Sequence, residues 1–257
     1  MADRRADAQL ALLDLAAEVA GAVKTRPPAP PGYTLEGYLT AIDAIFHVGP
    51  IRLGAERVFY GWLLSSETEL IAVVRGTVDA VEWWLDGQFL PIPKLHEPTG
   101  GRVEDGFSSI YDTLELETLD GESLGQASKA IAETCSAVTV TGHSLGGALA
   151  TYLAGDIGAL GCKVKGRLFA SPRPGDSLYG AWAARLIDDL ASYRFAPDVV
   201  PDVPAGLGYE LLPGTIVLPD DPRVKRSLVA FHHLTSGYAP QLDPTIPIDP
   251  AYVAVAA

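Results

Sequence analysis

Hydrophobic and polar positions follow a helical period at the start of the chain. Between residues 8 and 23, leucines and alanines recur at helical spacing, and the proline-rich stretch at 27–31 ends this pattern. We therefore predict an amphipathic helix over residues 8–23 that packs on the outside of a sheet. The pattern also predicts a second helix over residues 34–46.

Shorter apolar blocks follow and predict first strands and then helices. Residues 57–64 and 70–75 flank a polar turn, which predicts two paired strands. Beyond Gly106, residues 107–119 and 122–134 predict two helices that lead directly into the next strand.

Strand and helix patterns alternate through the second half of the chain. They predict strands over 137–140, 165–170 and 192–196, helices over 148–154 and 176–190, and a late hairpin or edge strand over 211–218. This order predicts an α/β fold with a mostly parallel central sheet and helices on both faces. Active sites of such folds lie beyond the carboxyl ends of the strands.

Composition limits the size of the unit and the class of partner. The chain has 257 residues, 48% of them hydrophobic, and no polar linker divides it. We therefore expect one domain over residues 1–257, in which residues 1–31 form the N-terminal helix and a proline-rich linker. No apolar stretch reaches the ~20 residues of a transmembrane helix. The formal net charge of −13 argues against nucleic acid as a partner.

The two cysteines, Cys135 and Cys162, lack the spacing of metal ligands, and we expect buried or free thiols rather than a disulfide. The first residues lead into acidic positions rather than an apolar core with a cleavage site. We therefore see no export signal and expect a cytoplasmic protein.

The strongest chemical signal is the sequence Gly-His-Ser-Leu-Gly-Gly at residues 142–147, which lies between a predicted strand and a predicted helix. A serine in a sharp glycine turn of this kind is typical of the nucleophile elbow of α/β-hydrolases. Ser144 is then the nucleophile, and the amide of Leu145 lies where an oxyanion would form. The alternative is a glycine-rich turn whose serine caps the helix.

A serine nucleophile needs a base and an orienting carboxylate, which follow it in the order acid then histidine. Two histidines lie downstream of Ser144, namely His232 and His233. Asp198 follows the predicted strand at 192–196 and is the favoured acid. Asp202 is its close competitor, although a solvated loop aspartate between two prolines is the simpler interpretation of that residue.

The chain resembles the class 3 lipases, the group that includes fungal triacylglycerol lipases and related feruloyl esterases. Five blocks between about residues 70 and 238 carry this resemblance: Ile-Ala-Val-Val-Arg-Gly-Thr at 71–77, Val-Glu-Asp-Gly-Phe at 103–107, the elbow at 142–147, Ala-Ser-Pro-Arg-Pro-Gly-Asp at 170–176 and Asp-Val-Val-Pro-Asp-Val-Pro at 198–204. The resemblance implies an α/β-hydrolase fold. The sequence departs from the family pattern at Glu104, which stands in place of the usual histidine.

The resemblance also implies roles for single residues. It makes Asp198 the acid, favours His233 over His232 as the base, and adds the Thr77 amide to that of Leu145 in the oxyanion hole. It further implies a lid-like segment over residues 78–98.

Three residues of that segment are candidates for the substrate side. Trp83 matches the family's lid tryptophan, and Trp84 adjoins it. Asp86 is expected to orient the Thr77 hydroxyl. Plain packing of Trp83 and a surface-turn role for Asp86 are the alternatives. The proline-rich end of the segment, at 90–98, argues against a long amphipathic lid and therefore against interfacial activation.

The resemblance implies a serine hydrolase that cleaves neutral acyl esters of a small molecule or lipid through an acyl-enzyme. It requires no metal and no cofactor, and allows a transient lipid interface. An acyltransferase or thioesterase with the same triad is the first alternative. A non-catalytic binding protein of hydrolase-like fold is the second.

Overall fold

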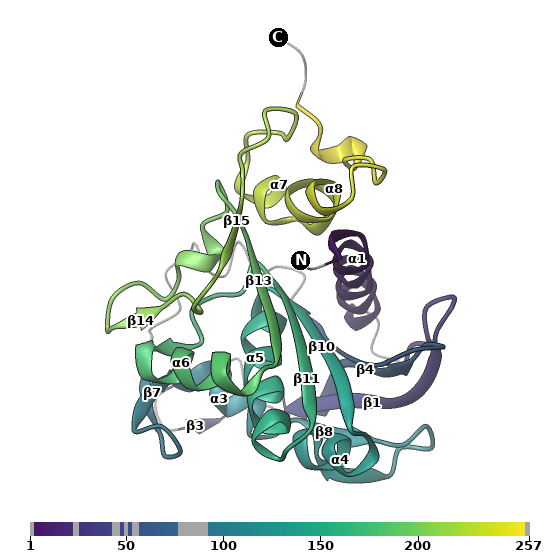
Figure 1. Ribbon diagram of the computed structural model, residues 1–257, viewed down its shortest axis with the longest axis vertical. Coiled ribbons are helices and arrows are strands. Elements are labelled where there is room, and N and C mark those ends of the chain that lie inside the picture. The colour runs from purple at the N-terminus through teal and green to yellow at the C-terminus, as the bar shows by residue number, and fades with distance from the viewer. Residues whose placement is uncertain are drawn as a thin grey trace.

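The computed structural model of the protein describes residues 3–22, 26–42, 47–48, 51–52, 57–76 and 92–254. A nine-stranded sheet runs through its centre in the order β15-β13-β11-β10-β5-β4-β1-β8-β9 (Figure 1). A four-stranded sheet, in the order β14-β12-β7-β6, and a two-stranded ribbon of β2 and β3 accompany it.

Five consecutive strands of the large sheet are parallel. They are β5 (Leu70–Val74), β10 (Ala137–His143), β11 (Lys163–Phe169), β13 (Asp189–Phe195) and β15 (Ile216–Leu218). Their carboxyl ends therefore meet at one edge, where loops from distant parts of the chain gather. The stretch predicted as a late hairpin or edge strand contains β15, which is an edge strand.

The remaining four strands are antiparallel: β4 (Arg57–Ser65), β1 (Thr34–Ile42), β8 (Glu115–Glu117) and β9 (Ser123–Gln126). The predicted pairing of 57–64 with 70–75 is confirmed by the β4–β5 register. The helix predicted over 34–46 is wrong, because β1 is a strand between β4 and β8. Its central residues are buried on both faces, so they show no alternation by which to recognise a strand.

The two helices predicted over 107–119 and 122–134 are only partly correct. The structure has α3 (Asp105–Tyr111) and α4 (Ala127–Thr134), with β8 and β9 between them. Leu114 and Leu116 are both buried, two residues apart, which is the period of a strand. Gly121, with a φ of +91°, lies at the turn between the two strands.

The small sheet packs against α3 and α6 (Ser177–Leu186). It consists of β6 (Pro93–His96), β7 (Gly101–Glu104), β12 (Gly175–Asp176) and β14 (Tyr209–Glu210). The ribbon pairs β2 (His47–Val48) with β3 (Ile51–Arg52). The short helical turns near the site are Val200–Asp202, Leu234–Tyr238 and Pro250–Tyr252.

Helices cover both faces of the large sheet, as predicted (Figure 1). On one face lie α3, α4, α5 (Leu145–Ala159) and α6 (Ser177–Leu186), and on the other lie α1 (Arg4–Gly21), α7 (Leu228–His232) and α8 (Ala239–Leu242). Strand β5 shows the division at residue level. Ala72 and Val74 belong to the first hydrophobic core, and Ile71 and Val73 to the second.

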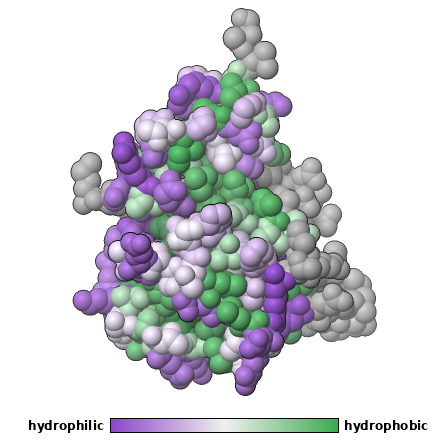
Figure 2. Space-filling model, turned by 90° about the vertical axis from the view of Figure 1, so that its right-hand side faces the viewer, coloured by the Kyte–Doolittle hydropathy of each residue, from purple (hydrophilic) through white to green (hydrophobic). Residues whose placement is uncertain are grey.

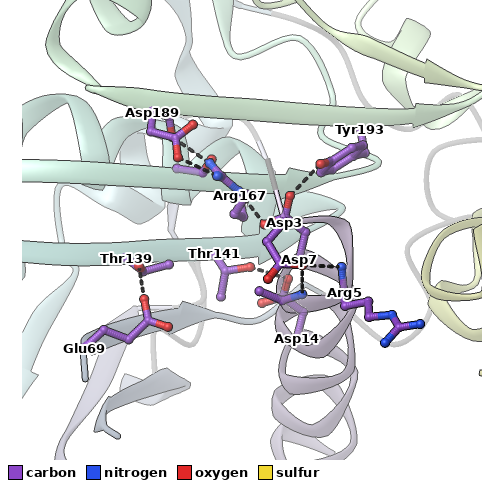
Figure 3. Close-up of polar contacts among 12 residues, drawn as sticks. Asp3, Arg5, Asp7, Asp14, Glu69, Thr139, Thr141, Arg167, Asp189 and Tyr193 are labelled. Carbon is purple, nitrogen blue, oxygen red and sulfur yellow. Dashed lines mark hydrogen bonds and ion pairs between the residues drawn. The ribbon is translucent and has the colours of Figure 1, made fainter. Parts of the chain in front are cut away.

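Helix α1 begins at Arg4, four residues earlier than predicted, because Asp3 caps its amino end. Its contact with the sheet is partly ionic (Figure 3). The buried Asp7 carboxylate accepts hydrogen bonds from Arg167 Nε and from the Tyr193 hydroxyl, both at 2.6 Å. Acidic side chains thus fix this helix against β11 and β13.

Within the described residues, no helix combines the length and the apolar character needed to cross a membrane. Figure 2 shows the face seen from the right-hand side of Figure 1, where hydrophobic and hydrophilic residues are interspersed.

Candidate active site

Ser144 lies in a strained turn between β10 and α5. Its φ of 55° and ψ of −129° fall outside the regions that non-glycine residues ordinarily occupy. Its amide donates to the Phe169 carbonyl at 3.0 Å, and its carbonyl accepts from the Gly147 amide at 2.8 Å. Strain of this kind costs about 1–3 kcal/mol and persists only where the surroundings hold it.

The glycines around Ser144 are required by close packing. A Cβ at Gly142 would overlap the Gly146 carbonyl, and a Cβ at Gly146 would overlap the Val74 carbonyl of the neighbouring strand. Strand β10 can therefore turn directly into α5 while both remain against β5. The side chain of Ser144 is placed beyond the carboxyl end of its strand, as the sequence predicts.

Asp198 and His232 form the second half of the site. Asp198 is 2% exposed, and its Oδ2 accepts a hydrogen bond from His232 Nδ1 at 2.9 Å. Its other oxygen accepts from the Val200 amide at 3.0 Å. The carboxylate therefore holds the imidazole in the tautomer and orientation that leave Nε2 free to act as a base.

The structure brings His232 rather than His233 to Asp198, which corrects the choice made from the resemblance. Helix α7 ends at His232, and the chain is already extended at His233. The ring of His233 lies against Tyr252 at 4.4 Å, and its Nδ1 accepts from the Thr235 amide at 3.3 Å. Burial lowers the pKa of His233. The side chain of His233 thus caps the helical turn at Leu234–Tyr238 and does not face Asp198.

The two atoms that a nucleophile and its base would join are both without a partner. Ser144 Oγ and His232 Nε2 are buried, and neither has a hydrogen bond within the described part of the chain. The elbow and His232 are neighbours, since His143 directly precedes Ser144 and its ring lies 4.5 Å from the His232 ring. Ser144 Oγ and His232 Nε2 are not hydrogen-bonded to each other in this structure. Unpartnered buried polar atoms are rare and often mark a functional site.

Asp202, the competing acid, has a structural role. Its carboxylate accepts from both terminal nitrogens of Arg194, at 2.8 and 2.6 Å, and lies 3.4 Å from Arg173. Two other aspartates downstream of Ser144, Asp220 and Asp221, pair with Arg226 and Arg223. Each of these carboxylates is thus engaged away from the imidazole of His232.

Sequence reasoning missed the partner that Asp198 has besides His232. The Tyr238 hydroxyl donates to Asp198 Oδ2 at 2.6 Å, and burial raises the pKa of Tyr238 well above its usual value. The available signal is the tyrosine itself, which follows the histidine pair closely in the sequence.

The oxyanion hole is described in part. Leu145 is the first residue of α5, where a helix amide has no carbonyl one turn earlier to bond. Thr77, Trp83, Trp84 and Asp86 lie outside the described residues. Gly76 is described, and a Cβ there would come within 2.7 Å of the His143 carbonyl and 3.2 Å of Ser144 Cβ.

The two cysteines lie near each other but are not bonded. Cys135 and Cys162 are free thiols, as expected, and the Cys162 thiol donates to the Cys135 carbonyl at 3.2 Å. Among the residues that the structure describes, no group of three histidine, cysteine or acidic side chains is placed to hold an ion.

Comparison with curated proteins finds plant enzymes. Phospholipase A1-II 7 of Oryza sativa subsp. indica is 32% identical over 174 residues, which cover 55% of this chain and 42% of the relative. Phospholipase A1-II 3 of Oryza sativa subsp. japonica is 31% identical over 67% of this chain and 50% of its own length. The chain thus spans about half or less of these relatives.

Solved structures share the fold at low sequence identity. A nonglycosylated lipase of Yarrowia lipolytica is 19% identical with a TM-score of 0.61, over 86% of this chain and 81% of that one. A lipase of Rhizopus microsporus var. chinensis is 18% identical with a TM-score of 0.58, over 81% and 72%. These likenesses confirm the predicted α/β-hydrolase fold.

The family model described as Lipase (class 3) matches residues 71–207, which is more than half of the chain. The matched segment contains all of β5 except Leu70, the Ser144 elbow and Asp198, which the structure brings to one edge of the sheet. The chain therefore belongs to the class 3 lipase family.

Proposed function

We propose that this protein is a serine carboxylic-ester hydrolase that cleaves acyl esters of lipids with Ser144, His232 and Asp198. The observation that carries the proposal is a pair of buried atoms, Ser144 Oγ and His232 Nε2, that have no hydrogen-bond partner among the described residues. The other nitrogen of the His232 ring is fixed by Asp198. Serine is a weak nucleophile, and an oriented neutral imidazole is the group that activates it.

The reaction has two halves. His232 Nε2 takes the proton from Ser144 Oγ as this oxygen attacks the ester carbonyl carbon, and the same nitrogen then returns a proton to the departing alcohol. Water attacks the acyl-enzyme in the second half, again with His232 as base. Asp198 stays ionised and stabilises the imidazolium in both halves.

The negative oxygen that forms in each half needs hydrogen-bond donors. The Leu145 amide is one donor, and the family resemblance assigns the second to the Thr77 amide. The crowding of Gly76 against Ser144 supports this assignment, because Thr77 follows Gly76 directly. Removal of one such donor typically lowers kcat by about 10²–10³-fold.

The substrate class is proposed from the relatives and the charge. Two of the relatives are named as phospholipases A1, and solved neighbours are named as lipases. A net charge of −13 disfavours anionic lipid surfaces. We therefore place the substrate among neutral or zwitterionic glycerolipid esters, with Trp83, Trp84 and Asp86 on its side of the site and a transient lipid interface.

The deciding experiment compares wild-type protein with Ser144→Ala on p-nitrophenyl butyrate, on emulsified triacylglycerol and on a zwitterionic phospholipid. Wild type should hydrolyse esters, and Ser144→Ala should lose turnover while its circular dichroism spectrum is unchanged. Equal turnover by the two proteins would refute the proposal. Acyl transfer to an added alcohol that outpaces hydrolysis would point to an acyltransferase instead.

A further inference from the structure

A second histidine lies beneath the proposed site without any role in the chemistry. His143 is the last residue of β10 and is 4% exposed. Its Nδ1 donates to Glu18 Oε1 of α1 at 2.6 Å, and its Nε2 donates to the main-chain carbonyl of His232 at 2.9 Å. The ring therefore links the first helix of the chain to the residue that carries the proposed base.

Both ring nitrogens of His143 face acceptors. A neutral imidazole has one N–H and can satisfy one of them, whereas an imidazolium satisfies both. Burial alone lowers the pKa of His143, but the Glu18 carboxylate and the hydrogen bonds outweigh it and raise that pKa. The geometry and the charge balance agree on a buried ion pair.

The ion pair touches three parts of the site. Ser144 follows His143 directly, and the His143 ring packs against the His232 ring with an interplanar angle of 38°. A Cβ on Gly76 would come within 2.7 Å of Glu18 Oε1, so the Glu18 carboxylate also abuts the strand end that precedes Thr77. Displacement of this carboxylate would disturb the nucleophile, the base and the oxyanion segment together.

Helix α1 is held firmly enough to act as a support. Asp7, Asp14 and Glu18 are separated by two turns and then one turn, so they project from one face of the helix. Asp7 bonds Arg167 and Tyr193, and Asp14 Oδ2 accepts from the Thr141 hydroxyl at 2.8 Å (Figure 3). Three acidic residues thus fix the helix to three neighbouring strands.

We propose that Glu18 and His143 are positioning residues of the ester-hydrolysis site. Their ion pair holds the His232 main chain and the elbow in register, so that the imidazole of His232 stays aligned with Ser144. This inference rests on the proposed function, because alignment matters only if Ser144 and His232 react.

The charged and titratable groups around His143 fix the direction of its pH dependence. Glu18 faces it from α1, His232 and Asp198 from the proposed triad, and Tyr238 packs edge-on at 6.2 Å. His143 also lowers the pKa of His233. The ion pair is complete below the ordinary histidine pKa of 6.5 and is lost as pH rises through the raised pKa.

The first test is Glu18→Gln, which keeps the size of the side chain and removes its charge. We expect kcat for p-nitrophenyl butyrate to fall by about tenfold or more, because small misplacements of catalytic groups cost that much, with KM unchanged. The alkaline limb of the pH profile should move to lower pH. An unaltered kcat and pH profile in an active enzyme would overturn the inference and leave the proposed function intact.

Asp14→Asn is the matched control. It lies on the same helix face and contacts the same strand, but it does not touch the elbow. Burial raises the pKa of Asp14 well above its usual value, so the amide changes little charge. Wild-type kcat, KM and pH profile are expected. A loss equal to that of Glu18→Gln would mean that docking of α1 matters rather than the ion pair, and would overturn the inference.

The second test needs no variant. Nitrogen-15 NMR of the histidines in the wild-type protein reports whether each ring nitrogen carries a proton. At pH 6.5, where an ordinary histidine is half protonated, most His143 rings should carry protons on both nitrogens, and Glu18→Gln should abolish this signature. A neutral His143 in the folded wild type sinks the inference even if the variant fails to fold. Absence of ester hydrolysis by wild type would instead sink the proposed function.

Discussion

The hydroxyl of Tyr238 donates a hydrogen bond to Oδ2 of Asp198, the same carboxylate oxygen that accepts a hydrogen bond from the imidazole of His232. This oxygen is buried, so both donors replace the water that would otherwise solvate it. The acid of the proposed triad is therefore held by a tyrosine 40 residues away in sequence as well as by its own loop.

Removal of this hydroxyl in Tyr238→Phe should destabilise the protein by about 1.5–3 kcal/mol, the usual contribution of a hydrogen bond to a charged group. It should also lower kcat, because Asp198 becomes free to rotate. Urea unfolding and ester hydrolysis measure the two effects. Tyr252→Phe, on a partly exposed ring, is the control and should change neither quantity. Equal stabilities of all three proteins would contradict the structural role.

Separate alanine variants of the two adjacent histidines decide which one is the base. His232→Ala should lower kcat by about 10³-fold or more, since it removes the group that accepts the serine proton. His233→Ala should keep most of the activity, because its ring caps a turn and faces Tyr252. The reverse result, with His233→Ala inactive and His232→Ala active, would return the base to the residue that the resemblance favours.

The ion pair between Asp7 and Arg167 is buried at both ends, with side chains 0% and 1% exposed. Asp7→Ala leaves the guanidinium buried with Asp189 as its one counter-ion among the described residues, and we expect it to lower the free energy of unfolding by about 3–5 kcal/mol. Urea titration provides the measurement. Arg223→Ala removes a guanidinium that is 70% exposed in its pair with Asp221, and it should leave the midpoint nearly unchanged. Similar midpoints for both variants would contradict this ranking.

Glu104 is a buried carboxyl with an altered titration. Burial raises its pKa to about 7, although its hydrogen bond from the Phe107 amide works in the opposite direction. The folded protein therefore binds a proton that the unfolded chain releases near 4.5, so stability should fall as pH rises from there to about 7. Melting temperatures across this window should decline in wild type and less in Glu104→Gln. Parallel curves for the two proteins would rule this carboxyl out as the source.

Local sequence patterns predict those elements whose packing in the folded protein leaves a recognisable pattern of residues in the sequence. The Ser144 elbow was recognisable because the close contacts of Gly142 and Gly146 demand glycine. Strand β1 was mistaken for a helix because it is buried on both faces and its neighbours β4 and β8 are remote in sequence. Such a strand lacks the alternation that reveals a half-exposed one.

Tertiary structure, and not local sequence, determines which histidine faces Asp198 and which residues support it. His232 and His233 are adjacent, and which of them faces Asp198 is set by the residue at which α7 ends. No pattern within either segment relates Glu18 to His143, which are 125 residues apart. The family resemblance points to Asp198, which the structure pairs with His232, and to His233, which lies one position later.

The placement of α1 has a consequence for protein engineering. Its acidic side chains are the counter-ions of groups on strands that come much later in the chain. A shortened version that starts after the proline-rich stretch would leave the buried Arg167 guanidinium with Asp189 but without Asp7, and the buried His143 ring without Glu18. Such a trimmed product should be recovered from expression as insoluble material, and supplying the missing helix as a separate peptide should restore it.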